Sequence, residues 1–171
     1  FGTFTRQVSG YALEHLTPER GFDLTRFLVG SEGTLAVVLG ADVDLVQTPS
    51  ETILVVLGYD DMPTAAAAVP LLLPHKPIAI EGMDSRITDV VAARKGADAV
   101  PALPRGRGWL MVELAGEQVN ELQAAAQALV SDAQALDHMI VTDKVQTATL
   151  WRIREDGAGL SARNVKGQPA Y

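Results

Sequence analysis

The sequence contains no cysteine, only three histidines, and few aromatic residues, which make up 5% of its 171 residues. The absence of cysteine excludes disulfides, thiolate metal sites and cysteine nucleophiles. His15, His75 and His138 lie far apart in the sequence and show no metal-ligand spacing. We therefore expect no metal site and no thiol chemistry within this chain.

Basic residues are fewer than acidic ones: the sequence has 14 Lys and Arg and 21 Asp and Glu, which gives a formal net charge of −7. Such a balance argues against nucleic acid as a partner, since nucleic-acid-binding proteins carry a basic stripe. No apolar run approaches the roughly 18 residues that a membrane span needs. A hydrophobic content of 47% is nevertheless enough for a packed core. We expect a cytoplasmic location, with attachment to the periphery of a membrane as the alternative.

The first region, residues 1–48, combines turns with short apolar segments. The start of the chain up to residue 11 is typical of a strand, and Asp23 is placed to cap a short helix. A continuous apolar strand is expected over residues 34–39 and an alternating, half-exposed strand over 42–46. Because the sequence begins inside an apparent strand and ends without closing an element, we expect it to be an internal piece of a longer protein.

The second region, residues 49–171, alternates strands and helices. The predicted strands cover residues 52–58, 78–83, 108–114 and 137–142. The predicted helices begin at 60 or 61 and end near 73, begin at 84 or 85 and end near 94, and cover 119–129 and 144–154. This order is typical of an α+β domain of the ferredoxin-like kind, in which helices cover one face of a mostly antiparallel four-stranded sheet.

The segment with the strongest chemical character is the turn in which Gly30 and Gly33 flank Ser31 and Glu32. Glycine allows positive φ and close approach of a ligand to the backbone. Amide groups gathered in such a turn can accept an anion. The alternative is an ordinary helix end followed by the entry to a strand.

Two segments, RQVSGYAL at residues 6–13 and LVGSEGTL at 28–35, resemble the closing part of the flavin domain of the FAD-linked oxidases of the vanillyl-alcohol-oxidase (PCMH) type. This family includes D-lactate dehydrogenases and glycolate oxidase D subunits. The resemblance implies that the turn and following strand line bound FAD, largely through main chain. The residues so implied are Gly30, Ser31, Glu32, Gly33, Thr34, Leu35, Ala36, Val37 and Val38. The family usually has glycine in place of Ala36, and Thr-Glu in place of Leu39-Gly40.

Residues 49–171 resemble the substrate-side C-terminal domain of the same family. The matching segments are EGMD at 81–84, WLMVEL at 109–114 and WRIRE at 151–155. The resemblance therefore implies that residues 1–48 are the end of an FAD-binding domain and that 49–171 begin the C-terminal domain.

The implied activity is FAD-dependent dehydrogenation of a small 2-hydroxy acid, of D-lactate or glycolate type, by hydride transfer to the flavin. Arg154 would hold the substrate carboxylate through two parallel hydrogen bonds, and a base or metal outside this chain would take the hydroxyl proton. Electrons would pass to a quinone, a cytochrome, or an iron–sulfur subunit or domain, and the enzyme could form a homo-oligomer. Because the segments that hold the pyrophosphate are missing, we expect the piece alone to be inactive and to bind FAD weakly.

Alternatives stay open for the whole chain and for single side chains. The chain could be a non-catalytic ferredoxin-like module that binds a small molecule or dimerises through its sheet. Arg154 could instead be a surface arginine paired with Glu155 or Asp156. Other polar side chains have a structural and a functional interpretation, namely Glu81 and Asp84 (helix cap or acid–base group) and Arg105 and Arg107 (solvated loop or anion contact). The remaining ones are expected to be structural, namely Trp109 and Trp151 in the core, Arg152, His138, and His75 in an exposed turn.

Overall fold

The computed structural model describes residues 10–160, with only the helical backbone for 156–160. The chain divides into two compact units, Phe1–Val46 and Gln47–Tyr171. Each unit is described by itself.

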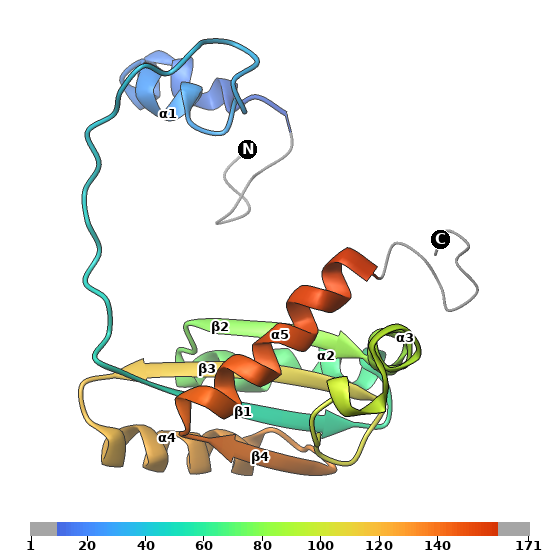
Figure 1. The fold of residues 1–171 in the computed structure, drawn as a ribbon. Coiled ribbons are helices and arrows are strands. Elements are labelled where there is room, and N and C mark those ends of the chain that lie inside the picture. The colour runs from blue at the N-terminus through green and yellow to red at the C-terminus, as the bar shows by residue number, and fades with distance from the viewer. Residues whose placement is uncertain (1–9, 161–171) are drawn as a thin grey trace. The chain divides into compact units, whose positions relative to one another are not determined.

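The first unit contains short helices: η1 (Leu13–Leu16), η2 (Pro18–Arg20) and α1 (Leu24–Leu28) (Figure 1). Asp23 caps α1 as the sequence predicts, because its side chain accepts a hydrogen bond of 2.9 Å from the amide of Arg26. The rings of Tyr11 and Phe27 meet edge to face, with centroids 6.5 Å apart. This contact packs the segment before η1 against α1.

The two strands predicted over residues 34–39 and 42–46 are absent. The segment carries no secondary structure, and its apolar side chains are solvated: Val37 is 84% exposed, Leu39 96% and Leu45 91%. A strand is stabilised by hydrogen bonds and side-chain pairs with a neighbour, and no strand between residues 10 and 160 pairs with this segment. The strand expected at the start of the chain lies almost wholly outside the described residues.

The second unit alternates strands and helices, as predicted. Its strands are β1 (Glu51–Tyr59), β2 (Ala79–Asp84), β3 (Gly108–Gly116) and β4 (Asp137–Val141). Its helices are α2 (Met62–Leu72), η3 (Leu73–His75), α3 (Ser85–Lys95), η4 (Ala97–Ala99), α4 (Val119–Asp132) and α5 (Lys144–Leu160). The helix starts follow from local chemistry, since Asp61 accepts from the amide of Thr64 at 2.8 Å and so caps α2.

The four strands form one sheet in the order β2-β3-β1-β4, and all neighbouring pairs are antiparallel (Figure 1). This is the expected α+β arrangement, in which a β-α-β unit and a second β-α-β unit interleave. Helix α3 is inserted between β2 and β3. The sheet places β1 in the interior, where every residue from Ile53 to Tyr59 is buried.

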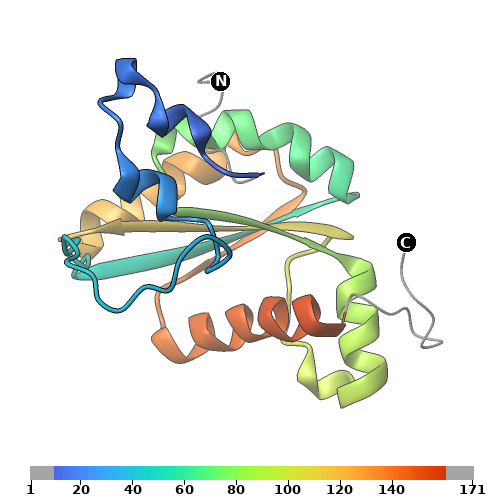
Figure 2. The same cartoon turned by 90° about the horizontal axis from the view of Figure 1, so that it is seen from above.

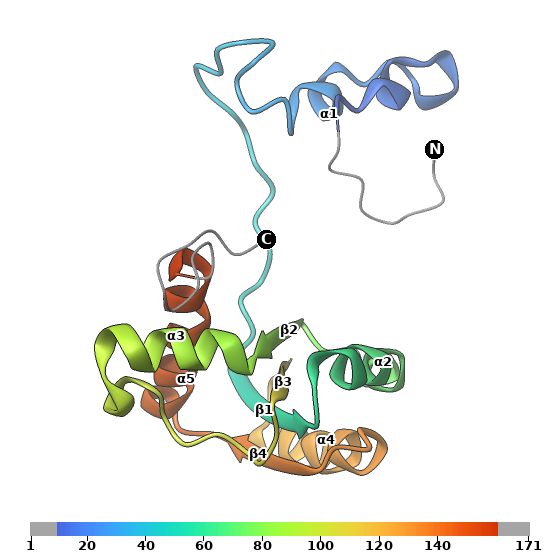
Figure 3. The ribbon, with the colours of Figure 1, turned by 90° about the vertical axis from the view of Figure 1, so that its right-hand side faces the viewer.

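The expectation that helices cover one face of the sheet is wrong, because they cover both. On one face, Ile53, Val55 and Leu57 of β1 pack with α2 and α4. On the other face, Leu54 and Val56 pack with α3 and α5. Figures 2 and 3 show the two helix layers on opposite sides of the strands. The physical reason is visible in β1, whose apolar residues follow one another without alternation, as in strands buried on both sides.

Candidate functional site

The candidate site lies on the sheet face that α3 and α5 cover, where Arg154 of α5 meets Glu81 of β2. The guanidinium Nε donates to Glu81 Oε2 at 3.3 Å, and Nη2 donates to Oε1 and Oε2 at 3.2 Å each. The two side chains are 43% and 39% exposed, so the pair lies at the surface. The carboxylate partner of Arg154 is thus a residue 73 positions away in the sequence.

Regular secondary structure fixes both partners. Glu81 shares its sheet face with Met83, two residues along β2, and Met83 is buried against α3 and α5. Arg154 follows Ile153, whose side chain is 2% exposed in the same cluster. The pair therefore joins a strand to a helix that already pack together through apolar side chains.

A second carboxyl group, that of Glu113 on β3, lies on the same face. Val112 and Leu114 point to the α2–α4 side, so the side chain between them points to the α3–α5 side. Burial raises the pKa of the Glu113 carboxyl above its ordinary value. Among residues 10–155, whose side chains the structure describes, the Glu113 side chain has no ion-pair or hydrogen-bond partner. Sequence reasoning missed Glu113, although its position as the lone acid within an apolar strand was a signal.

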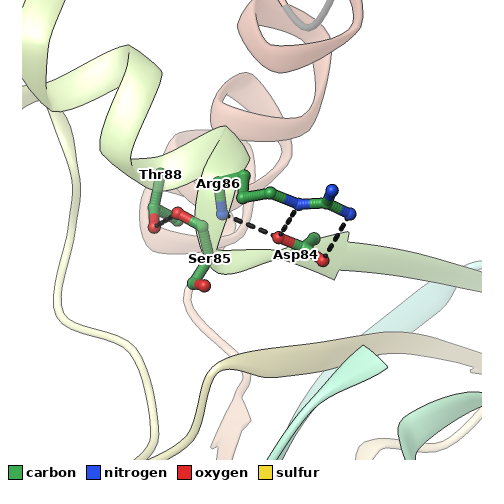
Figure 4. A network of polar contacts seen from close by, with 4 residues as sticks. All are labelled: Asp84, Ser85, Arg86 and Thr88. Carbon is green, nitrogen blue, oxygen red and sulfur yellow. Dashed lines mark hydrogen bonds and ion pairs between the residues drawn. The ribbon is translucent and has the colours of Figure 1, made fainter. Parts of the chain in front are cut away.

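Asp84 serves as a helix cap, the structural one of its two interpretations. Its Oδ1 accepts from the Arg86 amide at 2.8 Å and from Arg86 Nε at 2.9 Å, and Oδ2 accepts from Nη2 at 3.0 Å (Figure 4). The hydrogen bonds from Arg86 hold the pKa of the Asp84 carboxyl below its ordinary value. Thr88 Oγ1 donates to the Ser85 carbonyl in the same turn of α3. Asp84 therefore pairs with Arg86, whereas Glu81 pairs with Arg154.

The glycine turn of the first unit is open to solvent, and three residues have positive φ: Gly30 at 85°, Glu32 at 53° and Gly33 at 71°. Ser31 is buried, and its carbonyl accepts from the amide and the hydroxyl of Thr34 at 3.0 and 2.6 Å. Within residues 10–160, the amides of Glu32 and Gly33 have no acceptor. A Cβ on either glycine would meet no atom within 4 Å.

This geometry fits the approach of a ligand to main chain. Of the nine residues that the resemblance implies, Glu32, Gly33, Thr34, Leu35, Val37 and Val38 are exposed, as is Gly30, while Ala36 is half-buried and Ser31 is covered. The turn is therefore held by Ser31 and Thr34 and presents an uncovered backbone. The segment after the turn is extended without being part of a sheet.

The tryptophans are structural, as expected: Trp109 is buried, with its Nε1 donating to the Pro104 carbonyl at 2.8 Å, and Trp151 packs against the same cluster. His75 is less exposed than expected. Its side chain is 16% exposed and its Nε2 lies 2.8 Å from Asp132 Oδ2, joining η3 to the end of α4.

Arg105 and Arg107 lie in the loop before β3, where the Arg107 amide donates to the Tyr59 carbonyl at 2.8 Å and the Arg107 carbonyl accepts from the Ser85 amide at 2.9 Å. Together with Asp60, Gly106 and Leu136 they line an open depression of about 520 Å³. The Arg105 side chain donates to the Leu136 carbonyl at 3.2 Å. Arg152 and His138 are exposed.

The described residues contain neither a membrane-spanning helix nor a cluster of metal ligands. No helix between residues 10 and 160 is long and apolar enough to cross a membrane. Among the side chains of residues 10–155, no three His, Asp or Glu gather as a metal site would require.

Comparison with known proteins finds a matching family and several related dehydrogenases. Residues 48–171 match the family described as FAD linked oxidases, C-terminal domain. Over 98% of its length the chain is 29% identical to the D-2-hydroxyglutarate dehydrogenase of Pseudomonas putida and 28% identical to that of Escherichia coli. Over 83% of its length it is 25% identical to the D-lactate dehydrogenase of Anaerostipes hadrus. The chain spans 18% of the length of the first two curated relatives and 31% of the third.

Proposed function

The chain belongs to the FAD-linked oxidases, and from this we propose that it is part of a flavoenzyme that oxidises a small 2-hydroxy acid to the 2-oxo acid. Relatives along nearly the whole chain are dehydrogenases of D-2-hydroxyglutarate and, along most of it, of D-lactate. Bound FAD would supply the chemistry by accepting a hydride from the substrate. The residues of this chain would bind and orient the reactants.

Arg154 is the observation that carries the proposal. Every 2-hydroxy acid has a carboxylate, and a guanidinium binds a carboxylate through two parallel hydrogen bonds. The arginine lies at the surface of the C-terminal domain. The residue before it on α5, Ile153, is buried and anchors this part of the helix. We assign it the role of holding the substrate carboxylate, so that the hydroxyl-bearing carbon is oriented toward the flavin.

We assign residues 30–38 to the FAD site. Two positive-φ glycines, and amides without acceptors among the described residues, fit a cofactor contacted through main chain. Residues 30–38 contain no lysine or arginine to pair with a pyrophosphate, so these residues would supply one wall of the site.

The substrate and the electron acceptor are the finer parts of the proposal. We favour a monocarboxylate of D-lactate or glycolate type, with D-2-hydroxyglutarate as the competing substrate suggested by the relatives' names. For the acceptor we propose a quinone, a cytochrome, or an iron–sulfur subunit or domain. One relative is a D-lactate dehydrogenase named for cytochrome, that of Arabidopsis thaliana.

The test uses the full-length protein. It should purify with bound flavin, and anaerobic D-lactate, glycolate or D-2-hydroxyglutarate should bleach the flavin absorbance. Arg154→Gln should keep the flavin and raise the KM for the preferred acid by about a hundredfold, since the carboxylate loses a charge-assisted bidentate contact. A non-catalytic module would purify without flavin, and flavin that no hydroxy acid reduces would contradict the proposed activity.

A further inference from the structure

We propose that Glu81 is a positioning residue for Arg154, which binds one edge of the guanidinium and leaves the other edge to the substrate carboxylate. This inference rests on the proposed function, because it concerns the same arginine. It assigns a role to a carboxylate that would otherwise be expected to weaken the binding of an anion.

The geometry of the guanidinium group is the first step. Its five N–H bonds form two edges that can each bind a carboxylate: one combines Nε with Nη2, and the other combines Nη1 with the second N–H of Nη2. Glu81 contacts only Nε and Nη2, at 3.2 to 3.3 Å. Among the described residues, nothing accepts a hydrogen bond from Nη1. Within the described part of the chain, one edge is therefore bound and the second is open to a ligand.

The rigidity of the two supports is the second step. Glu81 lies in a strand paired with β3, opposite Met111, which is fully buried. Arg154 follows a buried isoleucine on α5. An arginine side chain that is free in solution loses much rotamer freedom when it binds a ligand. A fixed carboxylate on one edge orders the side chain beforehand and reduces that loss.

The exposure of the pair is the third step, because it argues against a purely stabilising role. Both side chains are about two-fifths exposed, and the distances are longer than those of strong charge-assisted hydrogen bonds. An ion pair of this kind contributes little to the stability of a fold. Its more specific effect is on the orientation of the guanidinium.

Substitution of Glu81 distinguishes a positioning role from simple charge neutralisation, because the two roles predict changes of opposite sign in the KM of the hydroxy acid. If Glu81 only neutralised Arg154, then Glu81→Gln would free a cation and lower the KM of the hydroxy acid. If Glu81 orders Arg154, the neutral amide binds the guanidinium weakly, and KM rises by about threefold with little change in kcat. Glu81→Asp keeps the charge but is one methylene too short, and it should raise KM as well.

The experiment measures kcat and KM of the full-length flavoprotein, together with the Kd of oxalate, a carboxylate that does not react, from the flavin spectrum. Glu121→Gln removes the same charge from an exposed position on α4, on the opposite face of the sheet, and should change neither constant. In an Arg154→Gln background, Glu81→Gln should have no further effect, since its effect passes through the arginine.

The outcomes distinguish the two proposals. If Arg154→Gln leaves KM unchanged, the proposed role of the arginine is wrong. If Arg154→Gln raises KM while Glu81→Gln lowers it or leaves it unchanged, the positioning role of Glu81 is overturned and the proposed function stands. The positioning role is likewise overturned if substitution of Glu81 raises KM equally with and without Arg154.

Discussion

Glu81 on β2 and Glu113 on β3 are diagonal neighbours on one face of the sheet, since Glu81 lies opposite Met111 and Glu113 lies opposite Ala79. Diagonal positions on adjacent strands are within reach of long side chains. Of these two glutamates, Glu81 has a cation as partner among the described residues and Glu113 has none. One sheet face therefore carries two carboxyl groups in different electrostatic surroundings.

Glu113 gives a prediction on pH. Because burial raises its pKa in the folded chain, the folded state retains the proton over a range in which the unfolded chain has lost it. The contribution of Glu113 to the free energy of unfolding should therefore be fully present below the pKa of the unfolded chain, and it should be lost as pH rises through the pKa of the folded chain. Glu113→Gln should stabilise the chain at neutral pH and reduce this dependence, which urea midpoints from about pH 4 to about pH 7 would measure. A midpoint that falls at neutral pH in the variant would contradict the prediction.

Asp84 gives the opposite dependence. Its pKa is lowered chiefly by the hydrogen bond from Arg86, so its contribution is present above the unfolded pKa and is lost as pH falls through the folded pKa. Asp84→Ala removes the cap of α3 and should cost about 1 kcal/mol at neutral pH. Asp89→Ala, at an exposed position within the same helix, is the matched control and should cost much less. Equal losses in the two variants would show that the cap contributes nothing specific.

Tyr59 connects the central strand to the end of α4. Its hydroxyl donates to the Ala133 carbonyl at 2.9 Å in a buried position, and burial raises the pKa of Tyr59 to about 12. Tyr59→Phe leaves the carbonyl without its partner and should cost about 1 to 2 kcal/mol of unfolding free energy. Guanidinium denaturation of the variant and the parent chain measures the difference. A variant as stable as the parent would mean that water replaces the hydroxyl.

Substitution by alanine should reduce stability by different amounts at Gly106 and at Gly30. At Gly106, with φ of 154°, a Cβ would lie 2.6 Å from the Tyr59 carbonyl oxygen, so Gly106→Ala should cost about 2 to 4 kcal/mol. At Gly30 the space is open and only the positive φ is unfavourable, which costs about 1 kcal/mol. Gly40→Ala, with neither positive φ nor a close neighbour, is the control for both. Thermal unfolding of the three variants should therefore rank Gly106→Ala lowest and Gly40→Ala closest to the parent.

The same glycine turn permits a test of cofactor binding. In the full-length protein, Gly33→Ala should lower flavin content through the strained backbone, while Gly40→Ala should leave it unchanged. The flavin-to-protein absorbance ratio after purification is the measurement. Full flavin content in Gly33→Ala would remove the turn from the FAD site.

The sequence predicts the second unit well because its signals are local. Capping aspartates, helical periodicity and apolar strands lie within a few residues of one another, and β1 to α5 appear where those patterns place them. The family resemblance found in the same residues agrees with the match to the C-terminal domain of FAD-linked oxidases.

What the sequence could not supply depends on contacts between distant residues. The strand prediction at 34–46 was wrong because strand propensity without a neighbouring strand forms no ladder. The single helix layer was wrong because contacts between elements far apart in the sequence decide which face each helix covers, although the unbroken apolar run of β1 is typical of a strand buried on both faces. The pairing of Arg154 with Glu81 joins elements 73 positions apart, which local spacing cannot reveal.

The uncovered segment that follows the glycine turn has a practical consequence for anyone preparing this chain. Residues 34–39 read TLAVVL, without proline or charge, and their valines and Leu39 are solvated. Short stretches of this composition stack into cross-β assemblies when they meet copies of themselves. The isolated chain should therefore aggregate as its concentration rises, and Val38→Lys should keep it dispersed.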